Sequence, residues 1–244
     1  MTTNVFDGRI CLLASDSRWS WGSPDGAAFF FVDDTSFAKI VARGDTGIIF
    51  AGDSGVIGQW KAWLAAPTQA VPSSNGIAAM IVDLDAKKLI YSLGPIDFAA
   101  DAAFAGSGKV HAKACWLVNS CAKTAVESAK LKDVCSGGSV MFYNAGTGAN
   151  NLAEADSCDP KSISGSLQSK GYIMVKTNTG AEISTQCVPV KDAMNDPGIR
   201  QMAEQIMNGD VKMIAPCPDI PEAWSDTERA GFEKVMADRF LPKR

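Results

Sequence analysis

The N-terminus carries two apolar runs separated by a turn, and this pattern predicts a β-hairpin. Residues 3–15 contain the two runs, with Asp7-Gly8 between them. Asp-Gly flanked by apolar segments is a strong hairpin signal, because both residues tolerate the positive φ angles that tight turns need. We therefore expect Thr2 and Thr3, directly after Met1, to open the first strand of a sheet.

Apolar runs and turn residues continue to alternate along the chain. Strands are expected at 27–32, 38–41, 47–51, 77–82, 89–93, 101–105, 139–143 and 172–177. Helices are expected at about 56–64, 110–131, 196–207 and 225–240, the last with Ser225 and Glu228 as a capping box. Hairpins followed by helices, then strands and helices again, favour an α+β fold in which helices pack on stacked antiparallel sheets.

Composition restricts the class of protein. A length of 244 residues with 46% hydrophobic side chains fits one large domain or two small ones. The net charge is −4 and no dense Lys/Arg run occurs, which argues against nucleic-acid binding. Asp7 and Arg9 interrupt the first apolar stretch, so we expect neither a signal peptide nor a membrane span. Seven cysteines without a CxxC pair are typical of reduced thiols in a cytoplasmic protein.

The N-terminal threonine offers a specific chemistry. If Met1 is removed, Thr2 carries a hydroxyl and a free α-amine on one residue, and the amine can take the hydroxyl proton. An α-amine has a reference pKa of about 7.7–8.0, so a nearby ammonium makes it a neutral base near pH 7. Lys39 would supply that charge, and Asp16 would hold Lys39. The alternative is that these are ordinary strand residues.

Other candidate sites have weaker support. Gly52-Asp53-Ser54-Gly55 is similar to the string around a chymotrypsin-like serine, but that fold needs its histidine before the serine, and the single His111 comes after it. The fragment 146–148 lacks the Gly-Lys-Ser/Thr of a phosphate loop. Four acidic residues that suggest a metal straddle a hairpin and are better explained as solvated turn residues: Asp83, Asp85, Asp97 and Asp101.

Several motifs together resemble the proteasome-type N-terminal-nucleophile (Ntn) hydrolases, and most closely their bacterial Anbu-like branch. In chain order, they are Thr2-Thr3, Ala14-Ser15-Asp16-Ser17-Arg18, Phe37-Ala38-Lys39-Ile40 followed by Gly47–Gly52, Gly106-Ser107-Gly108, and Asp133-Val134-Cys135-Ser136-Gly137-Gly138. No single motif is specific, but five in order with similar spacing make a strong combination. The resemblance covers roughly residues 2–145.

The resemblance implies a role for each matching residue. Thr2 would be the nucleophile and, through its amine, the general base, with Lys39 and Asp16 setting the protonation of that amine. The amide of Gly52 would donate to the oxyanion. Three further residues would orient the amine and a proton-relaying water: Ser107, Asp133 and Ser136. The implied fold is a four-layer α-β-β-α sandwich, and no metal or organic cofactor is required.

The chain also departs from the family pattern. We expect a single domain over 1–244, with a loop insertion at 146–169 and an atypical C-terminal extension from about 187. The linker at 66–76 replaces much of the family's second helix. The first hairpin is two residues shorter than usual, which preserves the direction in which side chains face if each arm loses one residue.

We therefore predict a threonine-type peptidase or amide hydrolase that acts on peptides or polypeptides in a self-assembled homo-oligomer. The alternative is a catalytically inactive proteasome-like subunit with a structural or binding role. A third interpretation is an amide hydrolase of small molecules on the same scaffold. The sequence does not identify an ATP-dependent unfoldase partner.

Overall fold

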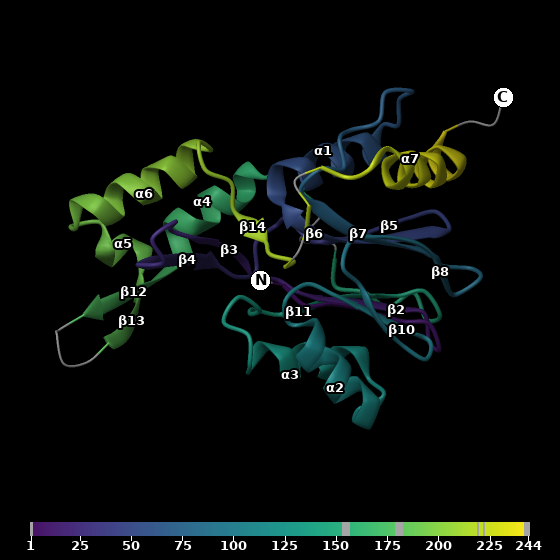
Figure 1. Ribbon diagram of the computed structural model, residues 1–244, viewed down its shortest axis with the longest axis horizontal. Helices are drawn as coiled ribbons and strands as arrows, with labels where there is room; N and C mark the ends of the chain where they lie inside the picture. Colours follow the sequence, from purple (N-terminus) through teal and green to yellow (C-terminus); the bar gives the residue numbers. More distant parts are fainter. Residues whose placement is uncertain (1, 153–156, 179–182, 219, 222, 242–244) are drawn as a thin grey trace.

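Two antiparallel sheets lie face to face between layers of helices in the computed structural model (Figure 1). The structure describes residues 2–152, 157–178, 183–218, 220–221 and 223–241. The smaller sheet has the order β11 (Val140–Asn144), β2 (Leu12–Asp16), β1 (Asn4–Asp7), β10 (Ala102–Ala105) and β9 (Asp97–Ala99). The predicted N-terminal hairpin is therefore the centre of a sheet.

The larger sheet has nine strands. Its order is β13 (Ile183–Pro189), β12 (Tyr172–Asn178), β4 (Ala28–Val32), β3 (Trp19–Gly22), β14 (Ile214–Ala215), β6 (Thr46–Asp53), β7 (Ile77–Asp83) and β8 (Lys88–Leu93), with β5 (Ile40–Arg43) paired to β6. The helices are α1 (Ser54–Ala65), α2 (Lys109–Asn119), α3 (Ala122–Lys130), α4 (Lys161–Lys170), α5 (Val190–Ala193), α6 (Pro197–Asn208) and α7 (Asp226–Phe240).

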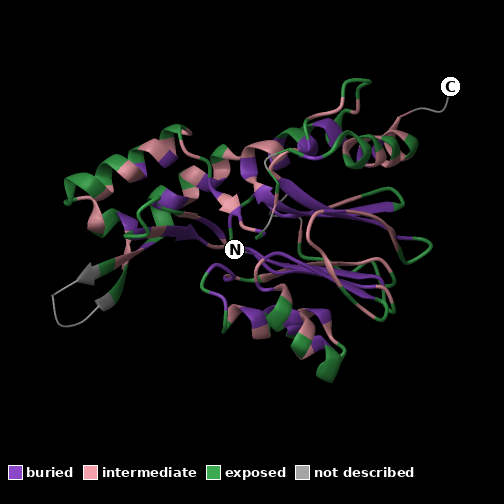
Figure 2. Cartoon of the chain, viewed as in Figure 1, coloured by how far each residue is buried: buried purple, intermediate pink, exposed green. Residues whose placement is uncertain are grey.

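Three large apolar cores and one small cluster lie between the layers. One lies between the sheets and includes Phe6, Leu13, Ile49 and Met80. A second lies under α2 and α3 on the smaller sheet, and a third lies between the larger sheet and the remaining helices. Figure 2 shows the buried residues concentrated in the strands, with exposed residues on the outer faces of the helices. The predicted α-β-β-α sandwich of two antiparallel sheets flanked by helices is confirmed.

Local sequence signals explain where several helices begin. The Asp53 carboxylate accepts from the amides of Gly55 and Val56, which caps α1. The predicted capping box at α7 is confirmed, since Ser225 and Glu228 each accept from the other's backbone amide. The string at 52–55 is therefore the start of a helix, where amides are left without intrahelical partners.

Two sequence expectations need correction. The loop expected at 146–169 is partly helical, because α4 occupies Lys161–Lys170 and buries Ile163 and Leu167, one turn apart, in the third core. Its Ser- and Gly-rich composition concealed that short apolar stripe. The helical region expected over 110–131 is two helices, because Ser120 adopts a left-handed conformation, with φ of 51°, and ends α2. Strand β3 was not predicted.

The C-terminal helix is docked on the larger sheet and on α1. The Phe232 ring is fully buried and meets the Trp60 ring edge-on at 4.9 Å. Arg239, near the end of α7, pairs with Asp45 at 2.9 Å and with Asp83 at 2.5 Å. The predicted helix at 225–240 thus covers the outer face of the sheet. No described helix has the length and apolar character needed to cross a bilayer.

Replacing Phe232 with alanine tests this docking. Phe232→Ala removes a fully buried ring and should lower the free energy of unfolding by about 3–5 kcal/mol, the usual cost of such a cavity. Phe98→Ala is the matched control, because Phe98 is 54% exposed and its loss should change stability by about 0.5 kcal/mol or less. Urea denaturation of both variants measures the difference, and equal losses would contradict the docking described here.

Candidate active site

The N-terminal threonine is fixed where the two sheets meet. Thr2 lies two residues before β1 and its side chain is fully buried. Its carbonyl accepts from the amide of Gly108 at 3.2 Å, and the carbonyl of the next residue, Thr3, accepts from the amide of Asp16 at 3.1 Å. Pairing of β1 with β2 and β10 on either side continues this alignment along the strand. The position of Thr2 is therefore set by backbone bonds from three segments.

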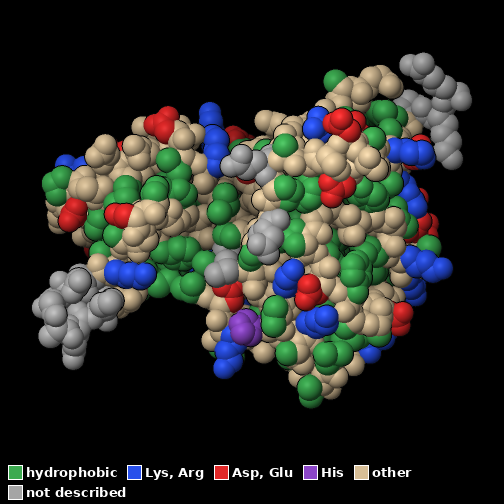
Figure 3. Space-filling view, viewed as in Figure 1, with side chains coloured by type: hydrophobic (Ala, Val, Ile, Leu, Met, Phe, Trp, Pro, Cys, Tyr) green, Lys and Arg blue, Asp and Glu red, His purple; other side chains and the backbone are tan. Residues whose placement is uncertain are grey.

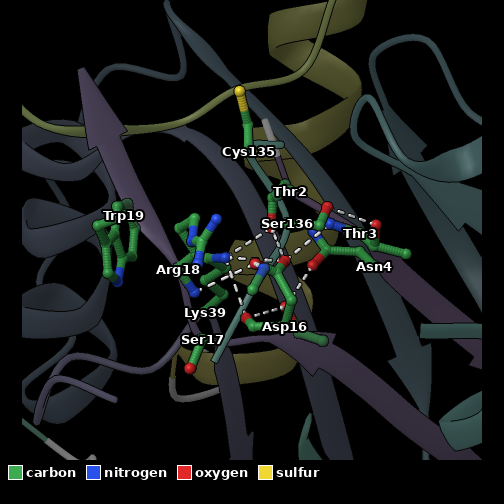
Figure 4. Close-up of polar contacts among 12 residues, drawn as sticks. Thr2, Thr3, Asn4, Asp16, Ser17, Arg18, Trp19, Lys39, Cys135 and Ser136 are labelled. Carbon is green, nitrogen blue, oxygen red and sulfur yellow. Dashed lines mark hydrogen bonds and ion pairs between the residues drawn. The ribbon is translucent and has the colours of Figure 1, made fainter. Parts of the chain in front are cut away.

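Lys39 and Asp16 meet the hydroxyl of Thr2 (Figure 4). Lys39 Nζ lies 2.6 Å from Thr2 Oγ1 and 3.0 Å from Asp16 Oδ1, and Thr2 Oγ1 lies 2.5 Å from the same carboxylate oxygen. Asp16 ends β2 of the smaller sheet, whereas Lys39 precedes β5 of the larger sheet. The sequence-predicted residues Thr2, Asp16 and Lys39 thus come together from both sheets.

Backbone donors hold the Asp16 carboxylate from several directions. Oδ1 accepts from the amide of Thr3 at 2.8 Å, and Oδ2 accepts from the amides of Arg18 and Gly137, each at 3.1 Å. Charge-assisted bonds of this kind are the strong ones in a buried setting. Asp16 is therefore oriented independently of the lysine that it pairs with.

Burial dominates the electrostatics of Lys39. The side chain is 1% exposed, and desolvation lowers the pKa of its ammonium below the ordinary value, while the Asp16 carboxylate opposes the shift. The Trp19 ring also faces the ammonium, with Nζ 5.5 Å from the ring centre. A lysine with a lowered pKa gives up its proton more readily, and the Nζ of Lys39 donates to the hydroxyl of Thr2.

The remaining predicted polar residues form a second cluster beside Thr3. Ser107 Oγ and Ser136 Oγ both lie within hydrogen-bond distance of Asp133 Oδ2, at 2.8 and 2.7 Å. Ser136 Oγ also lies 2.8 Å from the hydroxyl of Thr3. The structure brings these three residues together, and Thr3 is the residue through which they contact the segment that carries Thr2.

Glycine is required on both sides of Ser107 by close approach. A Cβ on Gly106 would lie 2.0 Å from the carbonyl oxygen of Thr2, and one on Gly108 would lie 1.9 Å from the hydroxyl of Thr3. Gly106 also has a positive φ of 87°. The Gly-Ser-Gly string therefore lets this turn lie directly against the N-terminal strand.

Gly52 lies at the end of β6, in register with Ile77 of β7 and Ala215 of β14. Its φ is 112°, and a Cβ there would lie 2.2 Å from the carbonyl oxygen of Gly76. Among the described hydrogen bonds, none joins Gly52 to Thr2. The oxyanion role of the Gly52 amide stays a prediction.

Sequence reasoning missed one contact of the site. The backbone nitrogen of Thr2 donates to the carbonyl of Pro216 at 3.1 Å. No motif or periodic pattern marks Pro216, because a backbone carbonyl is independent of residue type. Only the three-dimensional path of the chain after α6 brings it to the site.

Metal binding gains no support within the part of the chain that the structure describes. No group of three or more His, Cys, Asp or Glu side chains there could hold a metal ion. Of the aspartates considered above, Asp83 pairs with Arg239 and Asp97 pairs with Lys109 at 3.2 Å. These two carboxylates take part in ion pairs between secondary-structure elements.

Comparison with solved structures gives a distant structural likeness. No family model matches the chain, and no curated protein matches it. Among solved structures, it is similar to Thiobacillus denitrificans BPH in complex with epoxomicin, at a TM-score of 0.36 and 15% identity, covering 59% of this chain and 97% of the other. A likeness this distant says nothing about activity, which has to be argued from the residues of the site.

The buried ion pair makes a testable contribution to stability. Asp16→Asn leaves the Lys39 ammonium buried without its carboxylate, so the free energy of unfolding at pH 7 should fall by about 3–5 kcal/mol. Asp238→Asn is the matched control, because its pair with Lys234 is exposed and should matter by less than about 1 kcal/mol. Urea denaturation at several pH values checks both.

The loss of unfolding free energy in Asp16→Asn should depend on pH, because it arises from the buried Lys39. Because the folded-state pKa of Lys39 is lowered, the unfolded chain binds more protons between that pKa and the ordinary 10.5, so stability rises with pH there. Loss of Asp16 lowers the folded-state pKa further and extends this range. The deficit should therefore narrow as the pH is raised from about 7 toward about 10, and a constant deficit would contradict the assignment.

Proposed function

We propose that the chain is a threonine-type peptidase or amide hydrolase of the proteasome-like Ntn kind, with Thr2 as its nucleophile after removal of Met1. The observation that carries the proposal is the buried contact of Thr2 Oγ1 with Lys39 Nζ at 2.6 Å, beside the Asp16 carboxylate. A threonine hydroxyl is a weak nucleophile until a neighbouring base accepts its proton. In this contact Lys39 Nζ donates to the hydroxyl, and its positive charge would favour a neutral α-amine on Thr2 as the base that accepts the proton.

The proposed reaction has two stages. In the first, Thr2 Oγ1 attacks the amide carbon of a peptide and its proton passes to the terminal amine, giving a tetrahedral oxyanion. The carbon–nitrogen bond then breaks, the leaving amine takes that proton, and an ester on Thr2 remains. In the second stage water attacks the ester carbon and gives a proton to the terminal amine. The bond between that carbon and Oγ1 then breaks, the terminal amine returns the proton to Oγ1, and the acid is released.

The other residues have proposed supporting roles. The amide of Gly52 would donate to the oxyanion, because a fixed donor stabilises the negative charge that develops there in the transition state. Ser107, Asp133 and Ser136 would orient the freed amine and a water through Thr3, to which their cluster is bonded. We place these residues in positioning roles, because their described contacts reach the N-terminal strand and not the hydroxyl of Thr2.

A second candidate, a non-catalytic subunit of the same fold, is favoured by one observation. Thr2 has no exposed surface, and its nitrogen is bonded to the carbonyl of Pro216. A nucleophile must be reached by its substrate, so a permanently covered Thr2 would suit a structural or binding role. Intact mass separates the two candidates, since the hydrolase requires loss of Met1.

Labelling with a peptidyl epoxyketone tests the nucleophile. The unaltered protein should lack Met1 and should gain one adduct, located at Thr2 by fragmentation. Thr2→Ala should abolish both the adduct and peptide hydrolysis. Thr3→Ala should lower the rate of hydrolysis but keep it measurable, because the Thr3 hydroxyl contacts Ser136 of the supporting cluster and not the hydroxyl of Thr2. An adduct on Thr3, or hydrolysis by Thr2→Ala at the unaltered rate, would reject Thr2.

We also propose that the chain assembles with copies of itself through α2 and α3. Large apolar side chains on and beside these helices are exposed, and Figure 3 shows hydrophobic atoms at the lower end of the view, where the helices lie. They are Val110 at 60%, Leu117 at 62%, Val118 at 82% and Leu131 at 84% exposure. Apolar patches of this kind are typical of interaction surfaces.

Light scattering tests the assembly. The unaltered protein should have several times the mass of one chain at micromolar concentration, and the double variant V118D/L131D should approach the mass of one chain because charges resist burial at an interface. The control Y172D alters an exposed aromatic residue on β12, in the larger sheet on which α2 and α3 do not pack, and should leave the mass unchanged. A stable monomer of the unaltered chain would contradict the proposal.

A further inference from the structure

A two-residue strand closes a gap in the larger sheet beside the candidate active site. Strand β14 lies between β3 and β6, with Ile214 in register with Ser20 on one side and with Asp53 on the other. Ala215 is in register with Gly52. Figure 1 places this short strand near the N-terminus, between the larger elements that it joins. Without β14, the facing edges of β3 and β6 would present unpaired backbone groups there.

The same stretch of chain reaches from the first helix to Thr2. At one end the carbonyl of Met213 accepts from the amide of Ser54 at 3.3 Å, and at the other the carbonyl of Pro216 accepts from the nitrogen of Thr2 at 3.1 Å. Met213, Ala215 and Cys217 are buried. Residues 213–217, the connecting segment, therefore run from the start of α1 to the backbone of Thr2, a residue with no exposed surface.

The connecting segment is held by its buried side chains and by backbone pairing, and another extended chain could also make the backbone pairing. Strand pairing uses backbone groups, which every peptide carries, so a peptide can add to exposed strand edges in place of the segment. Proline lacks an amide donor, and Pro216 and Pro218 directly follow the strand, so the ladder cannot be extended in that direction. A pairing this short is the part of a sheet that opens most readily.

Firm anchors lie on either side of the connecting segment. Before it, α6 ends at Gly209, which has the left-handed conformation of a helix C-terminus. After it, Trp224 donates from its indole nitrogen to the carbonyl of Ser74 at 2.7 Å and is buried. Exposed Lys212 and Pro218 border the segment. The connecting segment can thus leave the sheet while α6 and α7 stay in place.

We propose that the connecting segment is an internal inhibitory strand that occupies the place an extended peptide must take, between β3 and β6, to reach Thr2. This inference rests on the proposed function of Thr2. The covered site and the hydrolase then describe two conformations of one protein, with the segment seated or displaced. A peptide substrate competes with the segment for the same strand edges, and the segment reduces both binding and reaction until it is displaced.

Weakening β14 tests the inhibitory strand. Ile214→Pro removes an amide from the middle of the sheet, where proline is not tolerated, and should release the segment. Ala223→Pro is the matched control, because Ala223 is exposed and lies in the same connection outside β14. Labelling by a peptidyl epoxyketone, followed by intact mass, should be at least tenfold faster in Ile214→Pro and unchanged in the control.

A binding measurement separates the strand from the chemistry. In a Thr2→Ala background, a fluorescent peptide with the sequence of residues 212–218 should bind the Ile214→Pro protein at least tenfold more tightly than the protein with intact β14. If the peptide binds more tightly to the Ile214→Pro protein but no variant that retains Thr2 is labelled by the epoxyketone, the hydrolase proposal is rejected and the proposal that the segment occupies a peptide-binding site is kept. Equal labelling of the unaltered chain and Ile214→Pro would reject the inhibitory strand and keep the nucleophile.

A milder variant covers the case in which Ile214→Pro does not fold. Met213→Ala removes a buried side chain of the segment but leaves every backbone donor in place. Circular dichroism and thermal unfolding identify which variants are folded. Faster labelling or tighter peptide binding by a folded variant supports the proposal, and a folded variant that matches the unaltered chain in both measurements overturns it.

Discussion

A lysine ammonium and an aspartate carboxylate, both withdrawn from water, organise the centre of this protein. Removing charges from water is costly, and the cost is offset only where geometry and additional hydrogen bonds are good. The carboxylate of Asp16 meets that condition through amides from three stretches of chain, those of Thr3, Arg18 and Gly137. The same requirement brings Lys39 across from the opposite sheet, so the charge pair joins the two halves of the sandwich next to Thr2.

The residues that the sequence could predict are those whose role depends on their own side chain and local order. Thr2, Asp16 and Lys39 follow one another in the first part of the chain. The glycines on both sides of Ser107 form a short motif that is visible in the sequence. The capping box at Ser225 is equally local. The sandwich itself followed from alternating apolar runs and from the resemblance that these strings carry, not from any single element.

What the sequence could not predict depends on contacts between distant segments. Strand β14 has two residues and no periodicity, and it exists because β3 and β6 leave room for it. Pro216 contacts Thr2 through its backbone carbonyl, so its side chain gives no sequence signal for the contact. Helix α4 was hidden in a polar stretch, since a stripe of only two buried residues, Ile163 and Leu167, is too short to stand out.

The core between the sheets has a consequence for the distance between Thr2 and Lys39. Thr2 is carried by the smaller sheet and Lys39 by the larger, so their separation of 2.6 Å is set by how far apart the sheets rest. Phe6, Leu13, Ile49 and Met80 fill that space. A displacement of about 1 Å can cost a reaction roughly a hundredfold. The volumes of residues that do not touch Thr2 thus help to determine whether Thr2 and Lys39 stay within hydrogen-bond distance.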